Sequence, residues 1–174
     1  RSHQVIPQKT CPIQSPLADQ LKEGVLRWAE TCGVSIYEEE TGRGLLRHIY
    51  VRTGKQGALL TLVVTSWKVP QPEKLIALCR ESCPSLVGIV LNKNTRQTNR
   101  VLGEECRTLW GEGRLQDSLC GVEFSLSPLS FYQVNQPQAQ RLYEQAVEYA
   151  AFSPEDTLLD LYCGTGTITL VMAR

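Results

Sequence analysis

Apolar positions recur at helical spacing in three segments of the chain. This spacing predicts helices over residues 16–32, 72–83 and 137–151. Each segment has a proline at its start, where a missing backbone N–H costs a helix nothing. Asn135 precedes the third segment and is its expected N-cap residue.

Short runs rich in Leu and β-branched residues lie between these helices. They predict strands over residues 33–38, 44–52, 59–66 and 86–92, followed by a meander of shorter strands over 108–110, 114–119 and 122–127. Residues 94–105 are polar and are expected to form a loop. Strands and helices in this order predict an α+β sheet with its helices on one face.

The end of the chain has a different pattern. An apolar strand is expected over 157–162, and it contains Asp160. A Gly-x-Gly turn at Gly164 and Gly166 follows, and then a new helix. A strand, turn and helix of this kind open the cofactor site of a doubly wound α/β domain. The fold class is therefore predicted as α/β, with an α+β central domain over 1–127 and the first elements of a Rossmann-like domain over 128–174.

The start and the end of the chain favour a piece of a longer protein. The sequence opens without an initiator Met or a signal-peptide pattern, and a Rossmann-like domain needs more strands than 128–174 supply. A central parallel strand is buried on both faces. We therefore expect strand 157–162 either to pack on a second chain, as in a homodimer or a swapped tail, or to be poorly ordered.

Composition narrows the class of protein only slightly. Lys and Arg number 18, as do Asp and Glu, so the overall charge neither favours nor excludes nucleic acid. No apolar run approaches the roughly 20 residues of a membrane span. The 7 cysteines are scattered and include no Cys-x-x-Cys pair. This usage predicts reduced thiols in a cytoplasmic protein and argues against a disulfide framework.

The glycine turn departs from two well-known phosphate-binding motifs. Thr169 stands where a dinucleotide fingerprint has its third glycine, and no lysine of a P-loop is near. What remains is an acidic strand before Gly-x-Gly, the opening of S-adenosylmethionine-dependent methyltransferases. The glycines would let the backbone approach the ligand. The alternative is an ordinary strand–turn–helix whose glycines serve geometry alone.

A second motif, Ser130-Phe131-Tyr132-Gln133-Val134-Asn135, directly precedes the last long helix. Two aromatic rings and two amides at such a junction can stack on a base and hydrogen-bond with it. Packing and capping are the alternative reading of these side chains.

In their order and spacing, the two motifs together resemble the RNA uracil-5-methyltransferases. The resemblance is to members that act on 23S ribosomal RNA, whose relatives methylate tRNA. It extends upstream through Gly44-Leu-Leu-Arg-His-Ile and Val5-Ile-Pro-Gln-Lys-Thr-Cys-Pro-Ile. It implies a methyltransferase that uses S-adenosylmethionine to methylate C5 of uridine in ribosomal RNA.

The resemblance also implies roles for particular residues. Phe131 would lie near the flipped uracil, and Asp160 would order the turn more than contact the cofactor. The implied cofactor-binding residues are Gln133, Tyr162, Gly164, Gly166, Thr167 and Asp160. The attacking cysteine and the carboxylate base would lie downstream of Arg174, so no catalytic residue is assigned and the isolated chain is expected to be inactive.

Four cysteines are candidates for a chemical role. Cys11 matches the last of four ligands of a [4Fe–4S] cluster in many of the resembled enzymes. A single thiolate cannot hold such a cluster, so only the full-length protein is a candidate. Cys79 and Cys83 share a helical face without further ligands, and packing is favoured over metal binding. Cys163 is likewise expected to pack.

Two further functions remain open on the sequence. The central region can be an RNA-binding or scaffold module, or the chain can belong to a methyltransferase that acts on protein or a small molecule. A downstream Asp-Pro-Pro-Arg segment beside a cysteine would establish the uracil enzyme. Arg47 and His48 are candidates for RNA contact, although a charged strand end is the simpler interpretation.

Overall fold

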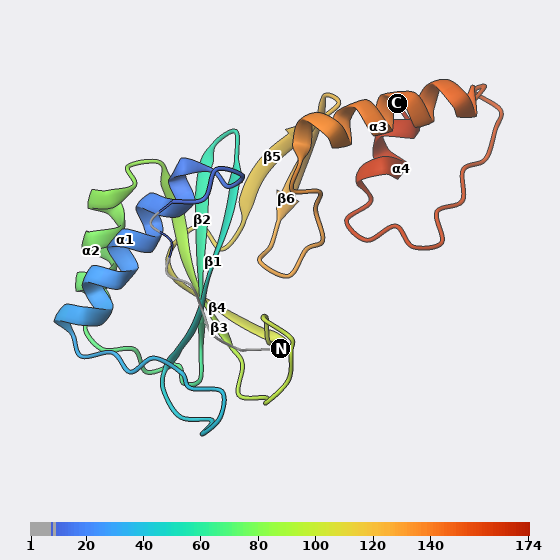
Figure 1. Cartoon of the computed structure of the whole chain (residues 1–174). Helices are drawn as coiled ribbons and strands as arrows, with labels where there is room; N and C mark the ends of the chain where they lie inside the picture. Colours follow the sequence, from blue (N-terminus) through green and yellow to red (C-terminus); the bar gives the residue numbers. More distant parts are fainter. Residues whose placement is uncertain (1–7, 9) are drawn as a thin grey trace.

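The computed structural model describes residue 8 and residues 10–174, so Val5–Pro7 and Lys9 of the upstream motif lie outside the described residues. Its main sheet has 4 strands in the order β1-β2-β3-β4 (Figure 1). The first and last pairs are antiparallel, and β2 runs parallel to β3. The strands are β1 (Leu46–Gly54), β2 (Gly57–Val64), β3 (Leu86–Lys93) and β4 (Glu105–Gly111).

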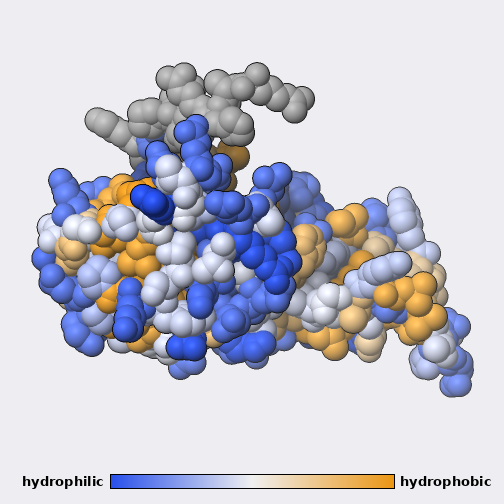
Figure 2. All heavy atoms as spheres, turned by 90° about the horizontal axis from the view of Figure 1, so that it is seen from below, coloured by the Kyte–Doolittle hydropathy of each residue, from blue (hydrophilic) through white to orange (hydrophobic). Residues whose placement is uncertain are grey.

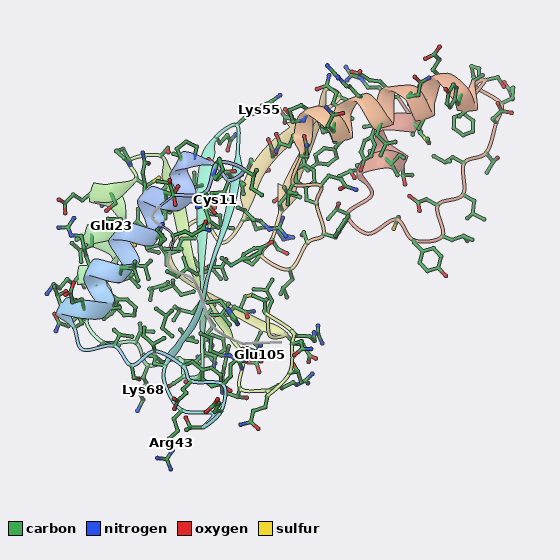
Figure 3. All side chains as sticks on the ribbon, in the orientation of Figure 1. Cys11, Glu23, Arg43, Lys55, Lys68 and Glu105 are labelled. Atoms are coloured by element: carbon green, nitrogen blue, oxygen red, sulfur yellow. The ribbon has the colours of Figure 1, made fainter. Side chains whose placement is uncertain are left out.

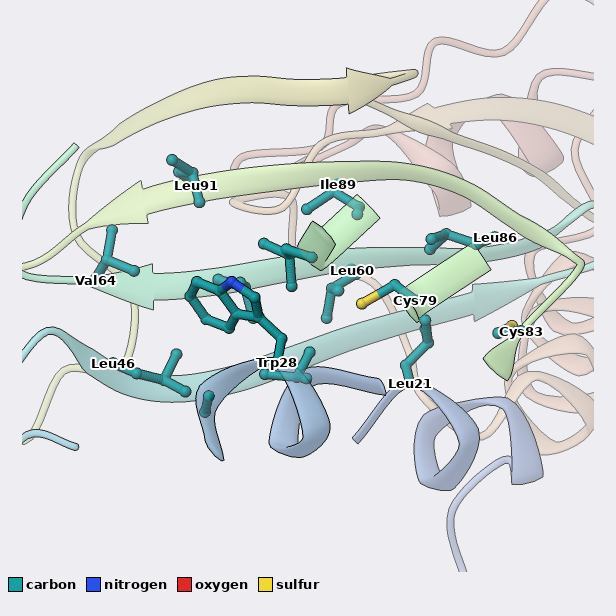
Figure 4. Close-up of a cluster of buried hydrophobic side chains, with 14 of the residues drawn as sticks. Leu21, Trp28, Leu46, Leu60, Val64, Cys79, Cys83, Leu86, Ile89 and Leu91 are labelled. Carbon is teal, nitrogen blue, oxygen red and sulfur yellow. The ribbon is translucent and has the colours of Figure 1, made fainter. Parts of the chain in front are cut away.

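Helices α1 (Pro16–Thr31) and α2 (Pro72–Ser82) pack against one face of this sheet, as the sequence predicts. Trp28 of α1 is fully buried, and its Nε1 donates a hydrogen bond to the carbonyl oxygen of Pro70 at 2.9 Å. Cys79 and Cys83 are fully buried in the same core, where they pack as apolar side chains (Figure 4). This core holds the sheet in place, and a groove runs along its edge strand β1.

Strand β2 is buried on both faces. Leu60 and Leu62 face the helices, whereas Leu59 packs with Val90 and Leu115 on the opposite face. Leu115 belongs to a separate hairpin, β5 (Leu115–Leu119) and β6 (Val122–Leu126), which covers part of that face.

The same hairpin also carries α3 (Gln136–Ala150) and α4 (Thr167–Met172), which extend away from the main sheet (Figure 1). Asn135 caps α3, since its side-chain oxygen accepts from the Gln138 N–H at 3.3 Å. The shared core is formed by Leu119, Phe124, Leu126, Ala139, Tyr143 and Val171. The hairpin thus packs against residues that precede the predicted domain boundary at 127/128 and against residues that follow it. The boundary itself stays a prediction.

Two predicted strands and one predicted sheet arrangement are wrong, although the short strands of the meander are confirmed. Residues 33–38 make only the single bridges Ile36 to Leu46 and Glu38 to Arg43, because no regular ladder continues them. The predicted meander is divided, since β4 joins the main sheet and β5–β6 form a sheet of their own. Residues 157–162 form no strand.

The reason for the last difference is that no strand of the described chain lies beside residues 157–162 to complete a ladder. Leu159 is 77% exposed and Leu161 is 76% exposed. The space-filling view shows apolar residues gathered on the α3–α4 end of the molecule (Figure 2).

Among the described residues, none of the helices combines the length and the apolar character that a bilayer crossing requires.

Candidate cofactor turn and adjoining groove

The turn between residues 163 and 166 has the backbone conformation that its glycines permit. Gly164 has φ of 56° and Gly166 has φ of 74°, in the left-handed region that glycine adopts without strain. The Gly166 N–H donates to the carbonyl oxygen of Cys163 at 2.7 Å and closes the turn. A Cβ atom added at Gly166 would meet no other atom within 4 Å, so the backbone conformation, and not crowding by the protein, requires glycine here.

Asp160 orders this turn with both oxygens of its carboxylate. Oδ1 accepts from the Tyr162 N–H at 3.1 Å, and Oδ2 accepts from the Thr169 hydroxyl at 2.6 Å. One acidic side chain therefore joins the segment before the turn to helix α4 after it.

The two sequence motifs meet through Thr165, a residue that the sequence did not single out. Its hydroxyl donates to the carbonyl oxygen of Phe131 at 3.2 Å. Thr167 is buried next to the turn, and its hydroxyl lies 3.0 Å from that of Tyr143 in α3. The sequence indicates Tyr143 only as a member of an apolar helix face, because a helical pattern does not reveal a hydroxyl contact.

The structure does not gather all the predicted cofactor residues. The Tyr162 side chain is 96% exposed, and among the described residues no hydrogen bond joins Gln133 to the glycine turn. Cys163 is exposed, so the expected packing of its thiol is wrong. No strand of the described chain lies beside residues 157–163, and Leu159, Leu161 and Tyr162 are exposed.

A groove of about 690 Å³ runs along the edge strand β1. Helix α1 forms one wall, and the hairpin and the loop of the second motif form the other. Gln133 lines this groove, together with Tyr132 from the same loop and Gln136 from the start of α3. The contributions of β1 include Arg47, His48, Tyr50 and Arg52.

Arg47 and Arg52 hold other parts of the chain in place. Arg47 donates from Nη1 to the carbonyl oxygens of Asn94 at 3.0 Å and Arg96 at 2.8 Å. Arg52 donates from Nη2 to the carbonyl oxygens of Pro128, at 3.2 Å, and Ser130. Burial, followed by the nearby Arg47 charge, lowers the pKa of His48. Arg47 and Arg52 thus serve as anchors, and RNA contact by Arg47 and His48 stays a prediction.

A buried carboxylate fixes the other end of the Phe131–Gln133 loop. Asp117 accepts from Gln136 Nε2 and from the backbone N–H of Lys55 at 3.3 Å. Burial, and then the charge of Asp117, raise the pKa of Tyr132. The loop is therefore attached before Phe131 to β1, through Arg52, and after it to β5 and the β1–β2 turn, through Asp117.

Within the described part of the chain, no group of three or more His, Cys, Asp or Glu residues is arranged to hold a metal ion. Cys11 is a partly buried free thiol. Its role as a cluster ligand stays a prediction.

Comparison with known proteins gives relatives over the whole chain, although no family model matches it. An uncharacterized RNA methyltransferase of Clostridium tetani is 41% identical over 100% of this chain. Counterparts of the same description from Caldanaerobacter subterraneus and Halalkalibacterium halodurans are 35% and 37% identical. The chain spans only 38% to 39% of the length of these relatives.

A solved structure shares the fold. The tRNA (uracil-54, C5)-methyltransferase of Pyrococcus abyssi, in complex with S-adenosyl-L-homocysteine, aligns with a TM-score of 0.80 over 98% of this chain and 41% of its own. The two sequences are 22% identical, so this likeness concerns the fold.

Proposed function

The chain belongs to the RNA methyltransferase family of these bacterial relatives, and on that premise we propose that it is part of an enzyme that methylates C5 of uridine in 23S ribosomal RNA in the cytoplasm. The observation that carries the proposal is the Thr165–Phe131 hydrogen bond, which joins the glycine turn to the loop of the second motif. The fold shared with a uracil-C5 methyltransferase supports the choice of base.

The residues of the turn fit S-adenosylmethionine. Gly164 and Gly166 leave the backbone open on one side, and Asp160 holds the turn in shape. Thr167, fixed by Tyr143, and Gln133 complete the proposed contacts, together with Tyr162. When bound, the cofactor supplies an electrophilic methyl group.

We propose that residues outside the turn position the base for methylation. Phe131 would hold the everted base by stacking, at the end of a loop that Arg52 and Asp117 attach to the central sheet. Eversion of a base costs roughly a few kcal/mol, which contacts of this kind must offset.

We further propose that Cys11 is one ligand of a [4Fe–4S] cluster in the full-length protein, and that the nucleophile and the base lie downstream of Arg174.

The test is calorimetric titration of S-adenosylmethionine into a full-length protein that carries this chain, followed by methyl transfer to 23S ribosomal RNA. We expect binding and 5-methyluridine in the product. The double variant Gly164→Val, Gly166→Val should lose cofactor binding, because β-branched side chains disfavour the left-handed conformation.

A matched control is Gly33→Val, the same substitution at another left-handed glycine, with φ of 62° and open space around it. This variant should keep its cofactor affinity despite comparable backbone strain. Unchanged affinity in the double variant, or methylation at a position other than uridine C5, would contradict the proposal.

A further inference from the structure

Two of the 3 tryptophans lie partly exposed beneath cationic side chains. The Arg107 guanidinium carbon is 4.3 Å from the centre of the Trp67 ring, and Lys93 Nζ is 5.8 Å from the same ring. The guanidinium carbon of Arg80 is 5.0 Å from the Trp110 ring. We call these residues, Lys93, Trp67, Arg107, Trp110 and Arg80, the Arg–Trp row.

An irregularity in the sheet brings the row onto one face. Arg107 pairs with Leu91, and Trp110 pairs with Ile89, across a register shift between β3 and β4. Leu91 and Ile89 both point into the core beneath the helices. Without the shift, residues three apart on a strand would face opposite sides, so the bulge places Arg107 and Trp110 together.

The helical layer leaves this face of β4 accessible. Helix α1 contacts β1 and β2, and α2 contacts β3, while β4 forms the far edge of the sheet. Arg80 reaches the row from α2, and Trp67 reaches it from the segment after β2. Both arginines of the row are exposed.

Among the residues that the structure describes, no carboxylate forms an ion pair with a cation of the row. In the described residues, the ion pairs with carboxylates involve Lys22, Arg27, Arg96 and Arg100, and none involves Arg80, Lys93 or Arg107. Glu105 lies opposite Lys93 in the ladder, at the start of β4 (Figure 3), but forms no ion pair with it within 4.0 Å. A guanidinium stacked on a ring still has its N–H edge free for an anion.

We propose that the Arg–Trp row binds a single-stranded segment of the RNA substrate. Its cations would pair with phosphates, and the indole and guanidinium planes would stack on bases. An acidic polypeptide could use the cations but would gain nothing from the rings. Because β4 and β1 are opposite edges of the sheet, the row is separate from the groove. This inference rests on the proposed function for the identity of the ligand.

The experiment is fluorescence anisotropy with labelled oligouridylate of about 20 nucleotides and the full-length protein, at several salt concentrations. The double variant Arg80→Ala, Arg107→Ala should weaken binding about tenfold and lower the salt slope by about 1–2. The double variant Arg80→Lys, Arg107→Lys should keep most of the salt slope, because both charges remain. RNA should also quench tryptophan fluorescence, and Trp110→Leu should reduce that quenching.

The control is Arg27→Ala, which removes one positive charge from the same helical layer, but from a residue paired with Glu81. It should leave RNA affinity within about twofold of the original, as expected of an exposed ion pair. Circular dichroism confirms that each variant is folded. The proposal that the row binds RNA would be overturned if the double variant Arg80→Ala, Arg107→Ala bound RNA as tightly as the control. It would also be overturned if the protein did not bind oligouridylate at all.

The outcome is distinguishable from failure of the proposed function. If the protein methylates uridine C5 but the double variant binds RNA normally, the row is refuted and the function stands. If uridine is not methylated but the double variant binds RNA more weakly, the row stands and the function is refuted.

Discussion

At the scale of single residues, buried side-chain amides decide the shape of the loop before β4. Asn92 is fully buried, and its Nδ2 donates to the carbonyl oxygens of Gly103 at 3.0 Å and Glu105 at 3.1 Å. Its Oδ1 accepts from the Gly103 N–H at 2.6 Å. The sequence indicates only that a strand ends here, because an asparagine after an apolar run does not reveal its partners.

Replacing Asn92 with Leu should lower the free energy of unfolding by about 2–4 kcal/mol, because buried backbone groups lose their partners. Urea denaturation followed by circular dichroism measures the loss. Asn99→Leu, an equivalent change at an exposed position of the same loop, should change stability by less than about 0.5 kcal/mol. Equal effects of the two variants would show that the amide contacts contribute nothing.

Burial raises the pKa of the Cys79 thiol from 9.0 to about 12. The folded state therefore holds this proton more tightly than the unfolded state, and stability should fall as pH rises from about 9 towards 12. The slope from this group is at most about 1.4 kcal/mol per pH unit. Urea midpoints measured across that range should fall less steeply in Cys79→Ala, whereas Cys163→Ala, which removes an exposed thiol, should keep the original slope.

At the scale of elements, a single glycine sets how closely the two helices approach. A Cβ atom on Gly24 would lie 3.1 Å from Cys79 Cα and 3.1 Å from the carbonyl oxygen of Leu78. The obstacle is backbone, which cannot move without shifting the whole of α2. The helical pattern predicts α1 and α2 separately, but it contains no information about their separation.

Gly24→Val should destabilise the protein by about 1–3 kcal/mol, because the helices must move apart. Glu23→Val, at the neighbouring exposed position, places the same side chain away from the helix interface and should cost only about 0.5 kcal/mol, through its lower helix propensity. Thermal unfolding of both variants separates packing from propensity. A Gly24→Val protein as stable as the original would mean that the interface between α1 and α2 yields readily.

At the scale of the whole molecule, Arg52 links the central sheet to the segment that carries Phe131. Its hydrogen bonds to the carbonyl oxygens of Pro128 and Ser130 cross from β1 to the loop of the second motif. Asp117 makes the corresponding link from β5 to Gln136. The two parts of the chain are therefore joined by side chains as well as by the hairpin core.

Arg52→Met in the full-length protein should weaken S-adenosylmethionine binding by about tenfold, because the loop carrying Gln133 loses its anchor. Arg52→Lys should recover only part of the affinity, since an ammonium lacks the fork of a guanidinium. Calorimetry and hydrogen exchange over residues 130–135 provide the measurements. Arg114→Met, which removes an exposed guanidinium, should change neither the cofactor affinity nor the hydrogen exchange of the loop. Equal cofactor affinities in all variants would refute the role of Arg52 as an anchor of this loop.

The helices and most strands of the main sheet follow from the sequence, because spacing, proline and capping residues act within a few positions. Asn135 and Pro72 stand where the sequence predicts helix starts. Residues 33–38 and 157–162 read as strands from their side chains, yet strands also need neighbours, which a local pattern cannot supply.

The sequence by itself determined the elements, the conformation of the glycine turn and the two motifs from which the family was inferred, since each depends on nearby residues. Only the tertiary structure decided that Thr165 joins the turn to Phe131, that Arg52 and Asp117 anchor that loop, and that Arg107 and Trp110 share a face. The physical reason is that these contacts join positions far apart in the chain, through register and packing that no local pattern encodes.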